Sequence, residues 1–176
     1  MELGLELKFA GGAPVLTEGS VIEGYGSLFG VTDQGGDAVA PGAFGASLER
    51  LRAKGDKVRM LWQHDPAKPI GVWDEVREDG KGLWVRGRLL PDVALAREAA
   101  ALIAAGAIDG LSIGYRTIRA ERNRAGRRLL KEVELWEVSL VTFPMLPEAK
   151  VGRKDADELR EMAAVFADAA ERLRAR

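Results

Sequence analysis

A long stretch of alternating apolar and polar residues towards the C-terminal end is the feature that most restricts the fold. Residues 131–143 repeat with a period of two, which is the period of a β-strand. Residues 110–123 are also extended in character, and a basic turn, NRAGRR, separates the two stretches. The sequence therefore predicts a long hairpin over residues 110–145, and strands dominate the expected fold.

Shorter strands and single helices precede this hairpin. The predicted helices carry end signals: Gly55 follows the first, Pro91 and Asp92 open the second, and Gly106 closes it. The predicted strands cover 2–9, 21–30, 57–64, 70–76 and 83–90, and the predicted helices cover 43–54, 92–105 and 154–175. A loop with a short extended piece is expected over 31–42. This order predicts a mainly β fold with peripheral helices (α+β), built on a mostly antiparallel, barrel-like sheet.

The counts of cysteine and histidine narrow the possible chemistry. The 176 residues are enough for one domain with its own core, and they include no cysteine and one histidine, His64. A cysteine nucleophile, disulfides, thiolate metal sites and metal sites with two imidazoles are therefore excluded. Any histidine-dependent reaction has to use His64, and neither a cofactor nor a metal is expected.

Charge and hydropathy argue against further classes. Twenty-six basic and 27 acidic residues leave a net charge of −1, which argues against a broad nucleic-acid-binding or basic membrane-binding face. No apolar run approaches the length of a membrane span, and the acidic start MELGLELKFAGG is unlike a secretory signal. We therefore expect a cytoplasmic protein whose partners are neither nucleic acid nor membrane.

Ser112 is the first candidate catalytic residue, within the sequence GLSIG (110–114). The pattern G-x-S-x-G marks the nucleophile of α/β-hydrolases, which lies on a sharp turn between a strand and a helix. Here the following residues are typical of a strand, and no histidine comes after position 64, so the chain does not fit that fold. Flanking glycines would still let a substrate backbone approach a serine nucleophile. The alternative is a glycine-flanked start of a strand.

His64 lies at the end of a predicted apolar strand, in LWQHDP, next to a loop. Rigid scaffolds commonly present catalytic groups at such positions. A serine hydroxyl needs a base within hydrogen-bond distance to act as a nucleophile at neutral pH. If Ser112 is a nucleophile, His64 has to be that base; the alternative is a partly exposed structural histidine.

Glu137 is the third candidate, because it falls within an apolar stripe expected on one face: Val133, Leu135, Glu137, Ser139, Val141 and Phe143. An unpaired buried carboxylate is costly, so Glu137 needs a partner. A histidine that requires an acid on its second ring nitrogen would meet this need. The alternatives are an arginine ion pair or a sheet with two half-buried faces. Asp65 and Asp109 are rival acids, although Asp65 before Pro66 is more typical of a turn.

Several motifs occur in order along about residues 19–152: GYGSLF (24–29), APGAF (40–44), LWQHD (61–65), GLSIGY (110–115) and LWEVSLVTFP (135–144). Together they resemble the prohead serine proteases of tailed phages, which are distant relatives of the herpesvirus capsid-assembly protease, assemblin. The resemblance implies an assemblin-like β fold with surrounding helices, and serine endopeptidase activity with the chain order His then Ser. Assemblins use a second histidine as third catalytic member. This chain has none, so Glu137 is assigned that place.

By this resemblance, Ser112 is expected to be the nucleophile, His64 the general base and Glu137 the acid that orients His64. The implied substrates are the major capsid protein precursor or its scaffold segment, cut inside the assembling prohead. Residues 1–152 would form the prohead protease domain and 153–176 a C-terminal amphipathic helix, with a homodimer expected by analogy with assemblin. Gene transfer agents, which are phage-like particles, use similar proteins. The alternatives are a catalytically inactive scaffold-binding module for capsid assembly, and an esterase.

Overall fold

The computed structural model describes residues 6–9, 15–17, 20–33, 35–122 and 126–143. These residues form two helices, α1 (Gly45–Lys54) and α2 (Ala94–Ala104). They also form the strands β1 (Glu6–Phe9), β2 (Val15–Thr17), β3 (Val21–Leu28), β4 (Asp37–Val39), β5 (Arg59–Trp62), β6 (Asp65–Glu78), β7 (Gly82–Leu89), β8 (Gly110–Arg122) and β9 (Arg128–Val141). Neither of these two helices is long and apolar enough to cross a membrane.

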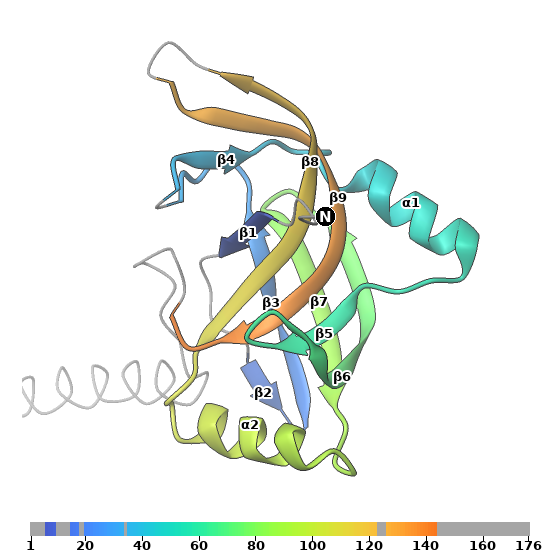
Figure 1. The fold of residues 1–176 in the computed structure, drawn as a ribbon, viewed down its shortest axis with the longest axis vertical. Coiled ribbons are helices and arrows are strands. Elements are labelled where there is room, and N and C mark those ends of the chain that lie inside the picture. The colour runs from blue at the N-terminus through green and yellow to red at the C-terminus, as the bar shows by residue number, and fades with distance from the viewer. Residues whose placement is uncertain (1–5, 10–14, 18–19, 34, 123–125, 144–176) are drawn as a thin grey trace, which may run out of the picture.

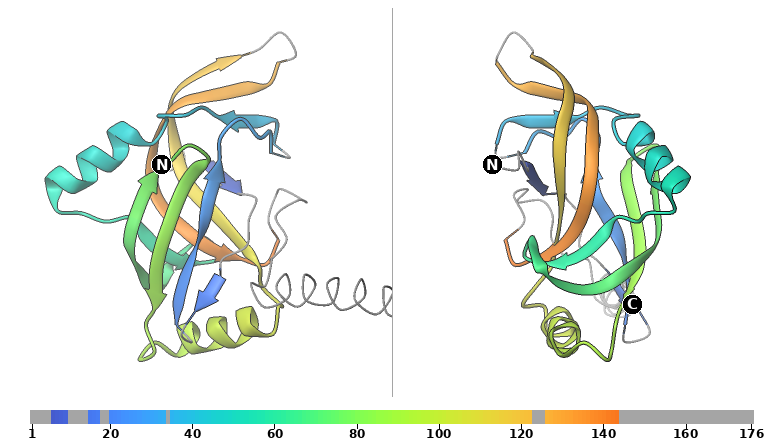
Figure 2. Two further views of the ribbon diagram at one scale, coloured as in Figure 1. Left: turned by 180° about the vertical axis from the view of Figure 1, so that it is seen from behind. Right: turned by 45° about the vertical axis from the view of Figure 1, so that its right-hand side comes forward.

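A single sheet joins the nine described strands. Their order is β1-β8-β9-β5-β6-β7-β3-β2, and β4 pairs with β9 outside this path. Most neighbours are antiparallel, while β4 and β5 each run parallel to β9. Figures 1 and 2 show the sheet strongly curled, with α1 outside it and α2 across one end. The predicted mainly β fold with peripheral helices is confirmed, and the two parallel pairs make the sheet mixed.

One apolar core joins the strands and helices. Side chains from distant parts of the chain are fully buried in it, including Ile22, Phe44, Ile70, Val85, Leu111, Ile113, Leu130 and Leu140. The alanine-rich face of α2 contributes Ala96 and Ala99. Because β8 and β9 supply core residues over much of their length, the predicted long hairpin is the central part of the sheet.

The observed elements differ from the predicted ones mainly at turns. The strand predicted over 57–64 ends at Trp62, and β6 already begins at Asp65, so Pro66 lies inside a strand. The β5–β6 register passes from Asp65 directly to Pro69, so Pro66 costs no hydrogen bond of that ladder. The short piece expected within 31–42 is β4, and β2 is a strand that the sequence does not predict. The helix expected over 153–176 lies outside the described residues.

β9 departs from strict alternation at Trp136. Tyr115 of β8 is opposite Leu135, whereas the preceding Gly114 is opposite Glu137, so Trp136 is an extra residue in β9. The core-facing residues of β9 therefore change parity, from Val133 and Leu135 before it to Val138 and Leu140 after it. Such bulges redirect side chains, often beside functional sites. Glu137 consequently lies on the face of β9 away from the core, which corrects the single stripe predicted from the sequence.

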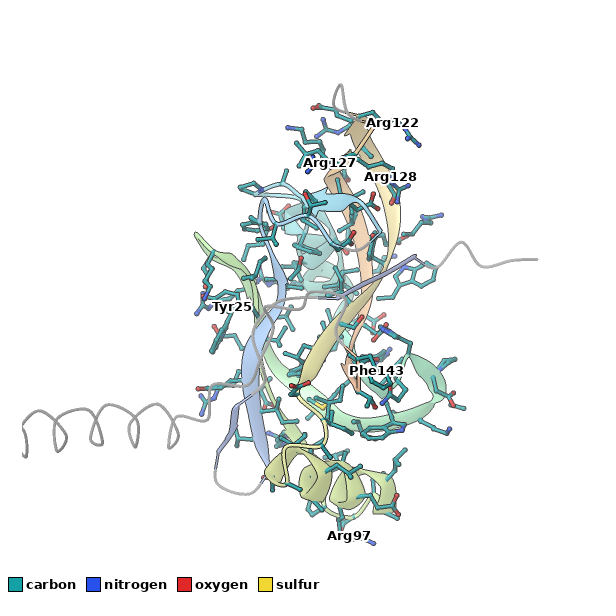
Figure 3. The ribbon with its side chains drawn as sticks, turned by 90° about the vertical axis from the view of Figure 1, so that its left-hand side faces the viewer. Tyr25, Arg97, Arg122, Arg127, Arg128 and Phe143 are labelled. Atoms are coloured by element: carbon teal, nitrogen blue, oxygen red, sulfur yellow. The ribbon has the colours of Figure 1, made fainter. Side chains whose placement is uncertain are left out.

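The far end of the β8–β9 hairpin is basic. Figure 3 shows Arg122, Arg127 and Arg128 together at this tip, away from Phe143 at the other end of β9. Arg128 forms an ion pair with Asp37 of β4, with 2.9 Å between Nε and Oδ1. This pair ties β4 to the hairpin, so part of the basic segment stabilises the fold.

Candidate active site

The turn between β5 and β6 has an unusual backbone for its residues. Trp62 pairs with Asp65, so Gln63 and His64 are the central residues of a tight hairpin turn. Both have positive φ, 52° and 62°, as a type I′ turn requires, and glycine or asparagine usually occupies such positions. Left-handed backbone costs a non-glycine residue roughly 1–2 kcal/mol. Strain of this kind persists where the surrounding structure enforces it, typically at functional sites.

β9 and the residue after it hold this turn. The Gln63 N–H donates to the Leu140 carbonyl (2.9 Å), which extends the β5–β9 pairing by one bond. The Gln63 side-chain Nε2 donates to Thr142 Oγ1 (2.6 Å), and the His64 N–H donates to Ser139 Oγ (3.2 Å). Each such bond contributes a net stabilisation of about 0.5–1.5 kcal/mol, so the three bonds together are large enough to offset the strain.

The imidazole of His64 contacts the carboxylate of Glu137, with 2.6 Å between Nδ1 and Oε1. An ionised carboxylate can only accept a hydrogen bond, so Nδ1 carries the proton in this contact. The other ring nitrogen, Nε2, then has the free electron pair, and it is buried. The side chains of His64 and Glu137 are 10% and 5% exposed, which shields the pair from water. The contact thus fixes the tautomer that a histidine base needs.

Ser139 completes the surroundings of Glu137. Its hydroxyl donates to Glu137 Oε2 at 2.5 Å, while Ser139 Oγ itself accepts the His64 N–H. Both carboxylate oxygens are therefore hydrogen-bonded, which lowers the cost of burying the group. Among the described residues the partners of Glu137 are His64 and Ser139, and not the arginine that was the alternative.

The register of β8 and β9 brings Ser112 to the same place. Ser112 is directly opposite Ser139, and Gly114 is directly opposite Glu137. Directly opposite residues share one face of the sheet, with Cβ atoms about 4.5–5.5 Å apart. Ser112 and His64 therefore both adjoin Ser139, one by strand pairing and the other by a hydrogen bond. Ser112 itself is fully buried.

Gly114 is needed because the Glu137 carboxylate lies over it. A Cβ at this position would be 2.1 Å from Glu137 Oε1, which is closer than any stable contact. The second glycine of the G-x-S-x-G pattern thus makes room for the acid. β8 continues as a strand to Arg122, which confirms that the pattern does not mark the strand-to-helix turn of an α/β-hydrolase.

The rival acids occupy other positions. Asp65 accepts the Ala67 N–H at 2.9 Å and pairs with Lys68 Nζ at 3.0 Å. The hydrogen bond from Ala67 and then that from Lys68 hold the pKa of Asp65 below its ordinary value. Asp65 therefore stabilises its own turn, and Asp109 lies in the loop before β8. The acid in contact with His64 is Glu137.

The sequence indicates three of the residues that gather here and gives no role to two others, Ser139 and Gln63. A signal for Ser139 is present, since it follows Glu137 by two positions on a strand and so shares its face. Gln63 carries no such signal, because its contribution depends on left-handed backbone that no local pattern indicates.

Known proteins resemble the chain in sequence and in fold. The chain is 34% identical over 149 residues to the prohead protease of Enterobacteria phage HK97, covering 83% of this chain and 63% of that protein. It thus spans somewhat less than two thirds of the length of this relative. Its fold is similar to the structure of the capsid assembly protease of bacteriophage T4, gp21, with a TM-score of 0.61 and 18% identity over 78% of this chain and 96% of that chain. The family model of the caudovirus prohead serine proteases matches residues 12–164. Since this match spans most of the chain, including His64, Ser112 and Glu137, the chain belongs to the caudovirus prohead serine protease family.

Proposed function

We propose that this protein is a serine endopeptidase of capsid maturation in which Ser112, His64 and Glu137 carry the reaction. The main support is the 2.6 Å contact between His64 Nδ1 and Glu137 Oε1, beside the strand position of Ser112. An imidazole placed between an acid and an alcohol is the arrangement that serine hydrolases use on many folds. Membership of the prohead serine protease family supports the same assignment.

The proposed reaction is acyl transfer from a peptide bond to water. Ser112 Oγ attacks the carbonyl carbon while His64 Nε2 takes its proton, and backbone N–H groups stabilise the oxyanion. The candidate donors are in residues 110–114, and a second candidate region, after Pro144, lies outside the described residues. His64 then protonates the leaving amine, which departs and leaves an acyl-enzyme. Water attacks this ester as His64 takes its proton. His64 then returns that proton to Ser112 Oγ as the acyl–oxygen bond breaks, which releases the carboxylic acid and regenerates both residues. Glu137 holds the tautomer and stabilises the imidazolium.

The proposed substrates are the major capsid protein precursor or its scaffold segment. The relatives that resemble this chain are named for prohead and capsid assembly proteolysis. Acting on such substrates would place the protein inside the assembling prohead, in the cytoplasm. A homodimer is part of the proposal by analogy with assemblin alone.

Co-expression with a capsid precursor that carries its scaffold segment tests this function. We expect the full chain to cleave the precursor and the Ser112→Ala variant to leave it intact. Ser27→Ala is the matched control, because it removes another fully buried serine hydroxyl, on β3. Processing of the precursor by Ser112→Ala would contradict the proposal.

A non-catalytic module for capsid assembly is the second candidate, and the complete burial of Ser112 favours it. A fluorophosphonate probe separates the two, because it reacts covalently with an activated serine. We expect labelling at Ser112 in the unmodified chain and none in Ser112→Ala. A folded chain without labelling would support the inert module, and hydrolysis of small esters without peptide cleavage would support an esterase.

A further inference from the structure

The candidate site is closed in the observed arrangement of strands. Ser112 is fully buried and Glu137 is nearly so, and a peptide bond therefore has no access to the serine hydroxyl. One edge of β8 is occupied by β9, which also carries Glu137 and cannot leave without removing the acid. The other edge is occupied by β1. A substrate therefore needs an approach on the β1 side.

β1 pairs with β8 along the residues that matter for the proposed reaction. The antiparallel register places Phe9 opposite Ser112 and Leu7 opposite Gly114, with Lys8 opposite Ile113 between them. Extended peptides bind proteins by adding a strand to a sheet edge, where main-chain hydrogen bonds hold them. The backbone of β1 thus has the form that a bound peptide would have at this edge.

β1 is also the strand most easily exchanged. It has four residues, it lies at one end of the strand order, and β8 is its strand partner within the described part of the sheet. β9, in contrast, has 14 residues and pairs with three other strands. Figure 1 shows β1, in dark blue, as a short strand beside the long β8–β9 hairpin. Leaving β8 would therefore cost β1 few hydrogen bonds, and an incoming peptide would replace them.

We propose that the edge of β8 from Ser112 to Tyr115 is a binding site for an extended peptide, and that β1 of the same chain occupies it until a substrate displaces it. This inference rests on the proposed function, since it names how the substrate of that same site binds. The substrate strand runs antiparallel to β8, and the bond to be cut lies near the residue opposite Ser112. β1 is then a competitor in the same chain that keeps the site closed.

A reversible cross-link between β1 and β8 tests the proposal in the full chain. Lys8 and Ile113 are directly opposite, a spacing that suits a disulfide. The unmodified chain has no cysteine, so no other thiol competes. The probe is a fluorescent synthetic peptide with the sequence of residues 3–12, LGLELKFAGG. We expect the oxidised Lys8→Cys/Ile113→Cys protein to bind this peptide at least tenfold more weakly than the same protein after reduction. The reduced form and the single variant Ile113→Cys are the controls.

A second variant keeps the test decisive if the cysteine pair fails to fold. Leu7→Pro changes no residue of β8 and disfavours β1 as a strand, since proline cannot donate to the ladder. We expect it to bind the peptide several-fold more tightly than the unmodified chain. Equal binding by the oxidised and reduced proteins, or by Leu7→Pro and the unmodified chain, would overturn the proposal.

Fluorophosphonate labelling, measured in the same samples, separates this inference from the proposed function. Labelling that is faster after reduction, together with tighter peptide binding, supports both. Peptide binding that follows the redox state without labelling of Ser112 in any form supports the peptide site and contradicts the peptidase. If Ser112 is labelled, and both labelling and peptide binding are the same in the oxidised and reduced proteins, the result supports the peptidase and contradicts the role of β1.

Discussion

Two consecutive hairpin turns, β5–β6 and β6–β7, are stabilised in different ways. In the β6–β7 turn, Asp79 Oδ1 accepts the N–H groups of Lys81 (2.8 Å) and Gly82 (3.0 Å), so the turn is built mainly from its own residues. The β5–β6 turn has no glycine, and its two central residues, Gln63 and His64, both have positive φ. Its hydrogen bonds come from β9 and Thr142, some 75 residues further along the chain.

The difference shows where tertiary contacts override the local preferences of a turn. A turn that follows local preferences forms wherever its sequence is placed. The Gln63–His64 turn reaches its geometry only when β9 is paired beside it. The orientation of the imidazole is therefore coupled to formation of the strand that carries its acid. Conflicts between local preference and observed backbone are expected at functional sites, and the conflict at this turn agrees with the proposed role of His64.

Removing the carboxylate charge of Glu137, which β9 places beside the Gln63–His64 turn, is expected to have the largest effect on peptide cleavage. In Glu137→Gln, an amide nitrogen near Nδ1 would favour the wrong histidine tautomer, and the imidazolium would lose its stabilising charge. We expect kcat/KM for peptide cleavage to fall on the order of 10³- to 10⁴-fold, with a smaller effect on thermal unfolding. Glu134→Gln is the control, since Glu134 is on the same strand in a partly exposed ion pair with Arg116. Unchanged activity of Glu137→Gln would reject Glu137 as the acid.

The sequence predicts the fold well because the fold follows local patterns. Alternation indicates the β8–β9 hairpin, and glycines Gly55 and Gly106 mark the ends of the two described helices. Strand pairing between segments that are distant in the sequence is harder to predict from local patterns. β2 has three residues and depends on β3 for its pairing, and the parallel position of β5 beside β9 is set by the tertiary fold. Strict alternation also misses the extra residue at Trp136, which depends on pairing with β8.

The candidate site is predicted only in part, because local sequence signals mark some of its residues and not others. His64 follows from being the single histidine, Ser112 from its glycine neighbours, and Glu137 from the cost of a carboxylate in an apolar segment. The support around them is not local. Ser139 acts on a turn far away in the sequence, and Gln63 requires a backbone that its own preferences disfavour.

Removing the hydroxyl that supports both the turn and the acid is expected to have an intermediate effect. In Ser139→Ala, Glu137 loses a donor and the His64 N–H loses its acceptor. We expect destabilisation of about 1–3 kcal/mol in urea unfolding, with a loss of kcat/KM of about tenfold or more, since ~1.4 kcal/mol of lost transition-state stabilisation is tenfold in rate.

Matched variants separate a positioning role of Ser139 from a packing role. Ser27→Ala also removes a fully buried serine hydroxyl, but one without a hydrogen-bond partner among the described residues, so we expect it to be neutral or stabilising. Ser139→Thr keeps the hydroxyl and should recover part of kcat. If Ser139→Ala lowered stability but left kcat and the pH profile unchanged, Ser139 would serve the fold alone.

The smallest effect is expected at the locally built turn, and it should depend on pH. The hydrogen bond from the Lys81 N–H is the main cause that holds the pKa of Asp79 below its ordinary value of 3.8, and the bond to Asp79 in turn raises the pKa of Tyr25. Because the pKa of Asp79 is lower in the folded chain than in the unfolded chain, its contribution to stability is present above pH 3.8 and is lost as the pH falls through the folded value.

Asp79→Asn should therefore lower Tm slightly at pH 7, and this difference should shrink on acidification towards pH 3. Labelling of Ser112 should be unchanged at pH 7, since the hydrogen bonds described above for the Gln63–His64 turn join it to β9 and Thr142. Slower labelling in Asp79→Asn would mean that the two turns are coupled through β6, and the contrast between a self-supported turn and one held by β9 would fail.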